Sequence, residues 1–354
     1  MYPRVTVNLN KLRHNLGLIN DMCHGQNIST AIVTKCVCAD SRIVQLIEES
    51  SADMFADSRL ENLKKIVTRK QKLLLRLGMP SEARDIVAYS DASLQSQLST
   101  VFALDDAAKK LSKKHKVILM VDLGDLREGI YFKEIQTIKA TARAIHACEN
   151  IEFFGIGANL TCFGGILPDE SNMKSLVDIA NEISDAIGFF PPVITAGNSS
   201  AMSMLRSGKL PCEINNLRIG EAFLLGKDTS DGSHMDGFYD DAFILEAELI
   251  ELERKPSKPF GSSGPNAFGE YVEFEDKGNM KRGICAIGRQ DADTDGLRPL
   301  DEGIEVIGAS SDHLILDTHE NGSLNVGDVL RFVPDYGALL RLFTSPYVKR
   351  EYIE

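Results

Sequence analysis

The segment STAIVTK at residues 29–35, followed by the stretch Ser41–Glu49, gives the pattern on which the fold prediction rests. A short β-branched run is typical of a buried parallel strand, and the next stretch repeats its apolar residues at helical spacing. Seven further apolar runs alternate with helical stretches such as 59–69, 105–113, 133–147 and 172–187. These runs are Asp53–Ala56, Leu73–Leu77, Ser99–Ala103, Val117–Asp122, Ile151–Asn159, Val193–Ala196 and Leu217–Leu225. Eight strand–helix units predict an α/β fold, a (β/α)8 TIM-like barrel.

The composition changes at KDTSDGSHMDGFYDD, residues 227–241, a Gly- and Asp-rich segment that we interpret as an exit loop. Beyond it, short strand-like runs are separated by Gly, Pro, Asn and Asp residues, which favour turns. These runs are Ala242–Leu252, Gly269–Glu275, Gly283–Gly288, Ile304–Ala309, Leu314–Asp317 and Asp328–Val333. We therefore expect two domains, the barrel over residues 1–228 and an all-β domain over residues 229–354.

Composition indicates a globular protein that acts on a small molecule. Hydrophobic residues make up 43% and charged residues 25% of the 354 residues, which is enough for a large core. The net charge is −12 and the basic residues are dispersed, so no face for nucleic acid is expected. Seven cysteines without paired CxxC spacing favour reduced thiols and a cytoplasmic location. Without an apolar signal core or a long apolar run, neither secretion nor membrane insertion is expected.

Polar residues at the carboxyl ends of the predicted strands are the candidate site, because barrel enzymes build their active sites there. Lys35 ends the first strand, where desolvation would favour the neutral amine that Schiff-base chemistry needs; a lysine that reaches solvent is the alternative. Ser199, Gly220 and Glu221 follow the seventh and eighth strands, where barrels often bind phosphate, although a helix N-cap explains Ser199 equally well. Arg218, in the eighth strand, is either a charge clamp beside that site or part of a surface ion pair.

Two further loops carry candidate groups. Asp122 ends the fifth predicted strand, and Arg127 lies in the loop after it, where a guanidinium could bind a substrate carboxylate or simply be solvated. Asn159 and Cys162 follow the sixth strand. A thiol at Cys162 is either a proton donor or a small buried hydrophobic group, and we favour the second interpretation.

Taken together, nine segments resemble the alanine racemase superfamily, in particular the alanine/ornithine racemase branch of fold type III pyridoxal-phosphate enzymes, over nearly the whole chain. They are AIVTK (31–35), ADSRLENL (56–63), VILMVDLGDLREG (117–129), GIGANLTCFGG (155–165), GNSSAM (197–202), LRIGEAFLLG (217–226), AIGRQDADTDGL (286–297), GASSDHLILD (308–317) and PDYGALLRLFTSPYV (334–348). The resemblance implies pyridoxal 5'-phosphate as cofactor and an amino acid as substrate. It also implies a homodimer in which the β-domain of one subunit closes the active site of its partner.

The resemblance also implies roles for single residues. Lys35 would bind the cofactor and move the α-proton, and Arg127 would lie near the substrate carboxylate. Arg218 would face the pyridine nitrogen and keep it unprotonated, so that the ring withdraws electrons less strongly, which favours racemisation over side reactions. The other cofactor contacts that it implies are Asn159, Ser199, Gly220, Glu221 and Tyr336.

One departure concerns the second base, which in alanine racemases is a tyrosine of the partner subunit in a Gly-Tyr-Ala-Asp context. This chain has Gly-Arg-Gln-Asp at residues 288–291, so Arg289 stands at the tyrosine position. Asp291 and His313 are candidate catalytic residues instead, and Arg289, Ser311 and Asp312 are expected to bind substrate. Carboxylates near a roomier pocket predict a basic amino acid such as ornithine or lysine. If Asp291 neutralises Arg289, a small or neutral substrate is the alternative.

The sequence therefore predicts an amino-acid racemase that interconverts L- and D-enantiomers by abstracting the α-proton. Alternatives are an alanine or broad-specificity racemase and a pyridoxal-phosphate-binding homeostasis protein without turnover. The second alternative resembles a bare barrel, which disagrees with the predicted β-domain. A threonine-aldolase or decarboxylase relative would need a different base, and the aldolase type would also need a divalent metal. No convincing ligand cluster is visible, so no metal is expected.

Overall fold

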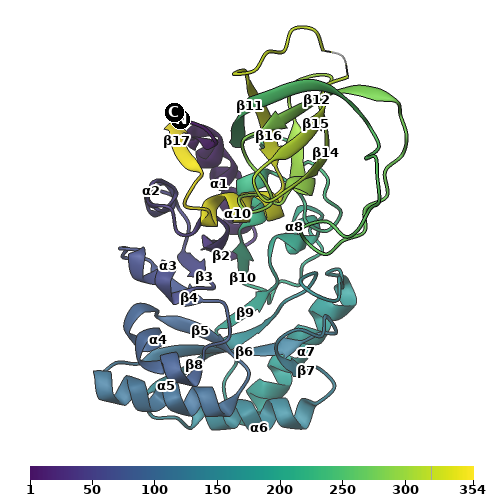
Figure 1. Ribbon diagram of the computed structural model, residues 1–354. Coiled ribbons are helices and arrows are strands. Elements are labelled where there is room, and N and C mark those ends of the chain that lie inside the picture. The colour runs from purple at the N-terminus through teal and green to yellow at the C-terminus, as the bar shows by residue number, and fades with distance from the viewer. Residues whose placement is uncertain (320) are drawn as a thin grey trace. The chain divides into compact units, whose positions relative to one another are not determined.

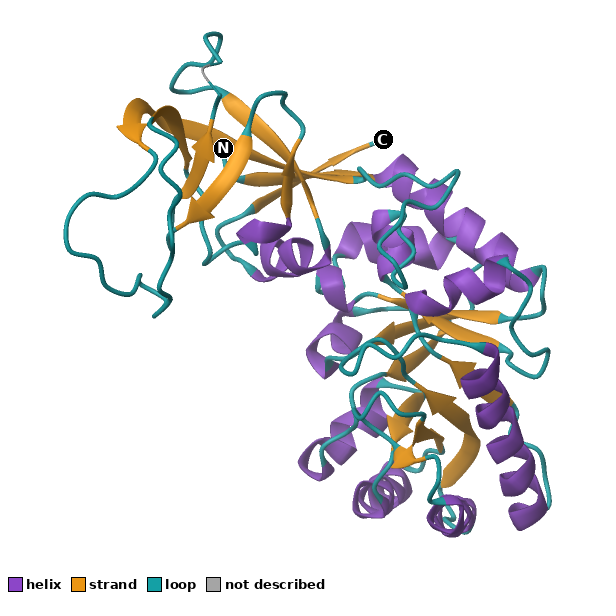
Figure 2. Ribbon diagram, turned by 90° about the vertical axis from the view of Figure 1, so that its right-hand side faces the viewer, coloured by secondary structure: helices purple, strands orange, loops and turns teal. Residues whose placement is uncertain are grey.

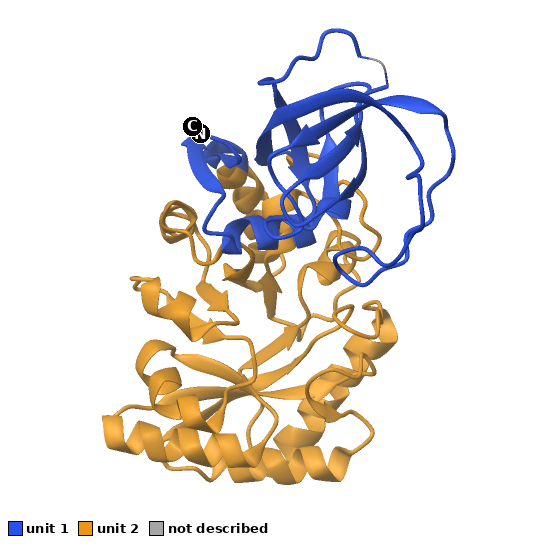
Figure 3. Ribbon diagram, viewed as in Figure 1, with its two compact units in different colours: residues 1–11, 240–354 blue, residues 12–239 orange. Residues whose placement is uncertain are grey.

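The computed structural model, which describes residues 1–319 and 321–354, divides the chain into two compact units (Figures 1 and 3). One unit is Leu12–Tyr239, and the other joins Met1–Lys11 to Asp240–Glu354. The boundary lies at residue 239 rather than at 228. Residues 1–11 leave the predicted barrel domain because β1 (Arg4–Asn8) pairs antiparallel with β11 (Phe243–Pro256) and parallel with β17 (Lys349–Ile353).

Eight parallel strands close into a barrel in the first unit, as Figure 2 shows, and confirm the predicted (β/α)8 fold. In sheet order they are β5 (Ala92–Gln95), β4 (Gln71–Leu74), β3 (Met54–Asp57), β2 (Ser29–Val33), β10 (Asn216–Ile219), β9 (Val193–Ala196), β8 (Ile151–Ala158) and β6 (His115–Asp122). The pairing of β6 with β5 completes the ring, and the two-residue strand β7 (Ile130–Tyr131) pairs in parallel with the end of β6.

Helices surround this barrel with their apolar faces turned inward. In α2 (Ser41–Glu49), for example, Ile43, Leu46 and Ile47 are buried, and the side chain of Asp40 accepts hydrogen bonds from the first-turn amides. The other helices are α1 (Leu9–His24), α3 (Leu60–Lys65), α4 (Ala83–Tyr89), α5 (Leu98–Leu111), α6 (Ile135–His146), α7 (Glu170–Ile187), α8 (Met202–Arg206) and α9 (Glu221–Leu225). Within the described residues no helix is long and apolar enough to cross a bilayer.

One of the eight predicted strands was wrong. Residues Ser99–Ala103 lie inside α5, and the fourth barrel strand is β5, which precedes that helix. The β-branched run there packs as a helix because Val101, Leu104 and Ala108 form one buried face at helical spacing. The predicted run Leu217–Leu225 divides into β10 and α9.

The second unit contains an antiparallel sheet in the order β13 (Leu297–Pro299), β16 (Val329–Pro334), β11, β12 (Asn279–Cys285), β15 (Leu314–Asp317) and β14 (Glu305–Ala309). The predicted strand Gly269–Glu275 is instead part of an exposed loop between β11 and β12. The unit also contains a helix, α10 (Tyr336–Thr344), which begins where the Asp335 carboxylate accepts a hydrogen bond from the amide of Ala338 at 2.8 Å.

The interior of the barrel is filled by apolar side chains that its strands contribute. This buried cluster comprises Ala31, Val33, Met54, Ala56, Leu73, Ala92, Leu94, Ile118 and Met120. A filled barrel offers no channel for a ligand, so binding groups must lie where the strands end.

Candidate active site

Arg218 in β10 is a buried cation, only 2% exposed, near the carboxyl ends of the barrel strands. Its Nη1 donates to the backbone oxygen of Thr195 at 3.2 Å and to the hydroxyl of the same residue. Its Nη2 donates to the backbone oxygen of Ala158 at 2.6 Å and to Oδ1 of Asn159 at 2.7 Å. Burial lowers the pKa of Arg218 to about 10, and the charge of Glu128 opposes this shift. In the described part of the chain its hydrogen-bond partners are all neutral, so the guanidinium is fixed without a contacting carboxylate.

Asn159 links Arg218 to an acidic residue that the sequence analysis missed. The Nδ2 group of Asn159 donates to Oε1 of Glu128, and Nη2 of Arg127 donates to the same oxygen at 2.6 Å. The Glu128 side chain is 14% exposed and that of Arg127 is 39% exposed, so the carboxylate is the inner member of the ion pair. Arg127, Glu128, Asn159 and Arg218 therefore form one continuous polar chain. Glu128 lies next to Arg127 in the sequence, but adjacency alone does not reveal which side chain points inward.

Ser199 and Gly220 lie where the neighbouring strands β9 and β10 end. The Ser199 hydroxyl accepts hydrogen bonds from the amides of Gly220 at 3.3 Å and Ala222 at 3.1 Å. A Cβ atom on Gly220 would lie 3.0 Å from Cβ of Val33, so a side chain there would crowd β2. Two amides thus fix the Ser199 oxygen as an acceptor and leave its O–H group to donate to another partner. The amide of Ala222 was not among the predicted contacts, and the contact of the Glu221 amide with a phosphate stays a prediction.

Lys35 lies two residues after the end of β2 and begins the short 3-10 turn Lys35–Val37. The amide of Cys38 donates to the backbone oxygen of Lys35 at 3.2 Å, and Cys38 itself has a φ of 52°. Because β2 lies between β3 and β10, Lys35 follows a strand whose neighbours end at Asp57 and Ile219. The barrel therefore gathers the predicted lysine, serine and arginine at the ends of adjacent strands.

Asp57, the last residue of β3, is a second residue that the sequence analysis missed. It is fully buried, and its Oδ2 accepts a hydrogen bond from the Thr34 hydroxyl at 2.7 Å. Oδ1 accepts from the amide of Arg59 at 2.8 Å, and Nδ2 of Asn62 lies 3.1 and 3.2 Å from the two oxygens. Burial raises the pKa of Asp57, while these hydrogen bonds and the charge of Lys35 act in the opposite direction.

The carboxylates in the loop after β6 form hydrogen bonds that hold the loop in place. Asp122 accepts hydrogen bonds from the amides of Gly124 at 2.8 Å and Leu126 at 3.1 Å, which fixes the turn after β6. Asp125, 1% exposed, joins this loop to the one after β8 by accepting from the backbone amides of Cys162, Phe163 and Ile166. These carboxylates hold the segment that carries Arg127 and Glu128.

The expectation that Cys162 is a buried hydrophobic group was wrong. Its thiol is exposed, and Nδ2 of Asn198 lies 3.1 Å from its Sγ atom. The amide of Cys162 itself donates to Asp125 at 3.1 Å, so this residue lies in the loop that Asp125 holds and not in the core.

The remaining predicted residues lie in the second unit, on two segments that contact each other. The amides of Arg289 and Gln290 donate to the backbone oxygens of Ser310 and Ser311 at 2.9 and 3.0 Å. This pairing places Arg289 beside the turn whose exposed side chains are Ser311, Asp312 and His313. Tyr336 lies elsewhere in the same unit, as the first residue of α10.

The partner of Arg289 is Glu270 and not Asp291, whose pairing with Arg289 was the alternative that the sequence left open. Its guanidinium pairs with Glu270 at 2.8 Å and lies 4.9 Å from the ring centre of Phe268. Asp291, in contrast, is 8% exposed and accepts a hydrogen bond from the Ser345 hydroxyl at 2.6 Å. Asp291 therefore does not neutralise Arg289, because its carboxylate is turned into its own unit.

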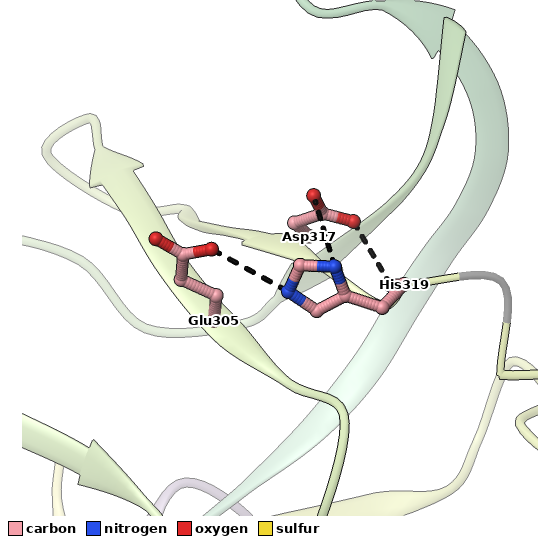
Figure 4. Close-up of side chains that lie close together, drawn as sticks. All are labelled: Glu305, Asp317 and His319. Carbon is pink, nitrogen blue, oxygen red and sulfur yellow. Dashed lines mark hydrogen bonds and ion pairs between the residues drawn. The ribbon is translucent and has the colours of Figure 1, made fainter. Parts of the chain in front are cut away.

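One cluster of possible metal ligands occurs among the described residues, and none of its members is a predicted site residue. His319 lies between Glu305 and Asp317, with Nε2 3.4 Å from one carboxylate and Nδ1 3.7 Å from the other (Figure 4). A single metal ion would bind one imidazole nitrogen, whereas here each nitrogen faces a different carboxylate. This geometry is that of a histidine–carboxylate ion pair.

Comparison with known proteins places this site in a family. The model of the alanine racemase N-terminal domain matches residues 7–227. The chain belongs to the alanine racemase family. It is 46% identical over 353 residues to an ornithine racemase from Acetoanaerobium sticklandii and 37% identical over 355 residues to a lysine racemase from Thermotoga maritima. Each alignment covers 99% of both proteins, and the chain is an amino-acid racemase.

Solved structures support the fold. The alanine racemase of Clostridium difficile 630 superposes with a TM-score of 0.73 at 18% identity, covering 100% of this chain and 96% of the other. The D-threo-3-hydroxyaspartate dehydratase of Delftia sp. HT23 superposes with a TM-score of 0.75 at 13% identity, covering 99% and 94%. This architecture is therefore shared with proteins of different named activities, and the substrate must be inferred from the site.

Proposed function

We propose that this racemase uses pyridoxal 5'-phosphate to interconvert the enantiomers of a basic amino acid such as ornithine or lysine. The observation that carries the proposal is the buried Arg218, which lies on the strand next to the one that Lys35 follows. Full-length similarity to an ornithine racemase and a lysine racemase supports the substrate class. The presence of a complete β-unit, rather than a bare barrel, supports turnover over simple cofactor storage.

The groups at the strand ends fit the proposed cofactor. The Ser199 oxygen accepts hydrogen bonds from the amides of Gly220 and Ala222, so its O–H group is left to donate to a phosphate oxygen. Lys35 would hold the cofactor through its amine, and Arg218 would face the ring nitrogen. We also assign Tyr336 and the Glu221 amide to the phosphate from the family resemblance. When bound, pyridoxal phosphate supplies an electron sink that makes the α-proton of an amino acid removable.

The protein's own groups would then orient the substrate and move its proton. The Lys35 amine takes the α-proton on one face of the substrate or returns it there. Arg127, which is held by Glu128, offers its remaining guanidinium N–H groups to the substrate carboxylate. Arg218, which is fixed by neutral acceptors, keeps its proton and so leaves the ring nitrogen without one.

The second proton carrier would come from the other unit. Of the two candidates, Asp291 is engaged with Ser345 inside its unit, whereas the His313 ring is exposed. We therefore assign the opposite base to His313, supplied by the partner subunit of a homodimer. Arg289, Ser311 and Asp312 would lie on the substrate side of the same surface. Asp312 is the exposed carboxylate there and would bind the side-chain ammonium of a basic substrate.

A chiral assay tests the proposal. The purified protein with pyridoxal phosphate should racemise L-ornithine and L-lysine with a higher kcat/KM than L-alanine or L-serine, and Asp312→Asn should reduce the ratio of ornithine to alanine. Lys35→Ala should remove both activity and the borohydride-reducible cofactor adduct. Lys64→Ala is the matched control, because this exposed lysine pairs with Asp85 at 2.7 Å and lies 5.0 Å from the ring centre of Tyr89, away from every residue assigned to the site. An alanine preference in the wild type would reject the substrate assignment, and a retained adduct in Lys35→Ala would reject the role of Lys35.

A further inference from the structure

The geometry points to a positioning role for Glu128: one carboxylate orients Arg127 toward the carboxylate of the substrate and, through Asn159, holds Arg218 in place. The inference rests on the roles proposed above for Arg127 and Arg218. It deepens them, because it names the side chain that fixes both cations and the edge of Arg127 that a substrate would meet.

The first argument is the geometry of the pair between Arg127 and Glu128. Nε of Arg127 pairs with Oε2 of Glu128, and Nη2 donates to Oε1 at 2.6 Å. Both carboxylate oxygens therefore lie along the side-on edge of the guanidinium, a bidentate arrangement that fixes the plane of the cation. Within the described part of the chain Glu128 is the only acceptor of Arg127, so the end-on edge, formed by Nη1 and Nη2, remains for a second carboxylate.

The second argument is exposure. Glu128 is largely buried, whereas Arg127 is partly exposed. An ion pair that reaches solvent adds little to stability, because water screens the charges and two long side chains lose freedom. The pair therefore matters mainly for orientation. Without it, a solvated guanidinium would turn about several single bonds and meet a substrate carboxylate in many geometries.

The third argument is the link to the buried cation. Oε1 of Glu128, which binds Nη2 of Arg127, also accepts a hydrogen bond from Nδ2 of Asn159. Oδ1 of Asn159 in turn accepts from Nη2 of Arg218 at 2.7 Å. Burial lowers the pKa of Arg218 to about 10 and the charge of Glu128 opposes this shift, so the acid also helps this cation to keep its proton. A change at Glu128 should therefore disturb both guanidinium groups.

Glu128→Gln separates orientation from charge. Glutamine keeps the size but has one acceptor oxygen, so its NH2 group would face a donor of Arg127 or of Asn159. In the protein loaded with pyridoxal phosphate, kcat for L-ornithine should fall on the order of tenfold, since a misplacement of about 1 Å can cost about a hundredfold. The inhibition constant of butyrate, a carboxylate without an amine, should not rise, because the substitution removes a negative charge beside Arg127. An unchanged kcat in the folded variant would overturn the inference.

A second measurement follows Arg127 without any turnover. Phenylglyoxal modifies accessible guanidinium groups, and peptide mass spectrometry of the full-length protein without cofactor gives the rate at Arg127. Loss of the bidentate pair should increase this rate severalfold in Glu128→Gln. Equal rates in the wild type and the folded variant would show that Glu128 does not hold Arg127, and would contradict the inference.

The matched control is Glu82→Gln. Glu82 pairs with Arg76 at 3.1 Å, and their side chains are 22% and 35% exposed, close to the 14% and 39% of Glu128 and Arg127. This substitution should leave both kcat and the labelling rate of Arg127 at their wild-type values. A loss of kcat as large as that of Glu128→Gln would mean that the effect does not depend on the pair with Arg127.

A double variant tests whether Glu128 acts through Arg127. Arg127→Lys removes the planar fork, so adding Glu128→Gln should reduce kcat much less than it does in the wild type, and full additivity would contradict the inference. If Glu128→Gln does not fold, Glu128→Asp keeps the charge, but its shorter side chain cannot reach Arg127 and Asn159 together. Its kcat should also fall, and a wild-type kcat would overturn the inference.

Failure of the proposed function gives a different result. In that case the wild type itself would not racemise ornithine or lysine, while the labelling rate of Arg127 would still respond to Glu128→Gln. An active wild type whose kcat and labelling are both insensitive to Glu128→Gln would instead remove Glu128 alone from the site.

Discussion

The side-chain oxygen of Asn159 accepts a hydrogen bond from Nη2 of Arg218 at 2.7 Å. The other end of the same amide donates to Glu128, so one neutral side chain connects a buried cation to a carboxylate. The orientation of the amide is fixed by this arrangement, since its oxygen must face the guanidinium and its nitrogen the acid. A substitution of Asn159 should therefore affect both Arg218 and Glu128.

Asn159→Ala should lower the free energy of unfolding by about 1–3 kcal/mol, because it leaves buried groups on Arg218 and Glu128 short of partners. Urea denaturation of the wild type, Asn159→Ala, Glu128→Gln and the double variant measures this coupling. If the two single effects simply add, the proposed chain through Asn159 does not exist.

Arg218→Lys should strongly reduce activity, although both side chains are cations. The guanidinium contacts four acceptors from β8, β9 and the residue after β8, whereas an ammonium has three donors and no planar fork. We expect a loss of roughly tenfold or more in kcat/KM, which corresponds to about 1.4 kcal/mol of transition-state stabilisation. Arg143→Lys, on the outer helix α6, is the control. Wild-type kinetics in Arg218→Lys would mean that charge alone is sufficient.

The pH dependence of stability should include a contribution from Asp57. Its pKa is raised in the folded state, so the native protein binds the proton more tightly than the unfolded chain does. Stability from this group is therefore present below the ordinary aspartate pKa and falls as pH rises through the raised value. Compared with Asp57→Asn, the wild type should lose stability over that interval. Thermal unfolding across the interval tests this, and parallel curves for the two proteins would contradict it.

His115 should make the folded protein less stable as the pH falls, which is opposite in direction to the effect of Asp57. It is fully buried, its Nε2 lies 2.9 Å from the Ser93 hydroxyl, and burial lowers its pKa to about 4. The unfolded chain takes up the proton first, so stability falls as pH drops from the ordinary histidine pKa toward about 4. The loss is on the order of 3 kcal/mol if the shift is fully expressed. His115→Gln should flatten this part of the stability profile, and an unchanged slope would exclude His115 as its source.

Mixing two inactive variants should restore activity if active sites are shared between subunits. Lys35→Ala removes the barrel's lysine, and His313→Ala removes a group from the β-unit. Random exchange of subunits would give mixed dimers with one intact site, and about a quarter of wild-type activity is expected. The activity should return only under conditions that let the subunits exchange, such as low protein concentration or mild denaturant. Full inactivity of the exchanged mixture would argue against sites built by two subunits.

The barrel could be predicted from the sequence because its strands are short apolar runs between amphipathic helices. The strand β5 was missed because Ser93 and Gln95 give it a polar character, although both side chains are buried. The neighbouring run Ser99–Ala103 has high strand propensity but folds as a helix, since its apolar residues also fit a helical face.

Candidate site residues could be predicted where the residue type itself suggests the chemistry. They could not be predicted where a role depends on contacts between distant segments. Lys35, Ser199 and Arg218 stand at strand ends that the pattern already located. Glu128 and Asp57 have no special sequence context, and only the pairing of distant segments places them against Asn159 and Thr34. The partner of Arg289 was also beyond prediction, because Glu270 lies in a segment that resembled a strand and forms a loop.

The pairing of β1 with β11 and β17 imposes an order on biosynthesis. The ribosome makes β1 first, then the whole barrel, and only afterwards the strands that complete the sheet around β1. Because domains generally fold as they emerge, the barrel can form while β1 is still an unsatisfied edge. Every nascent molecule of this racemase therefore passes through a stage that is catalytically incomplete and prone to pairing with the wrong strand.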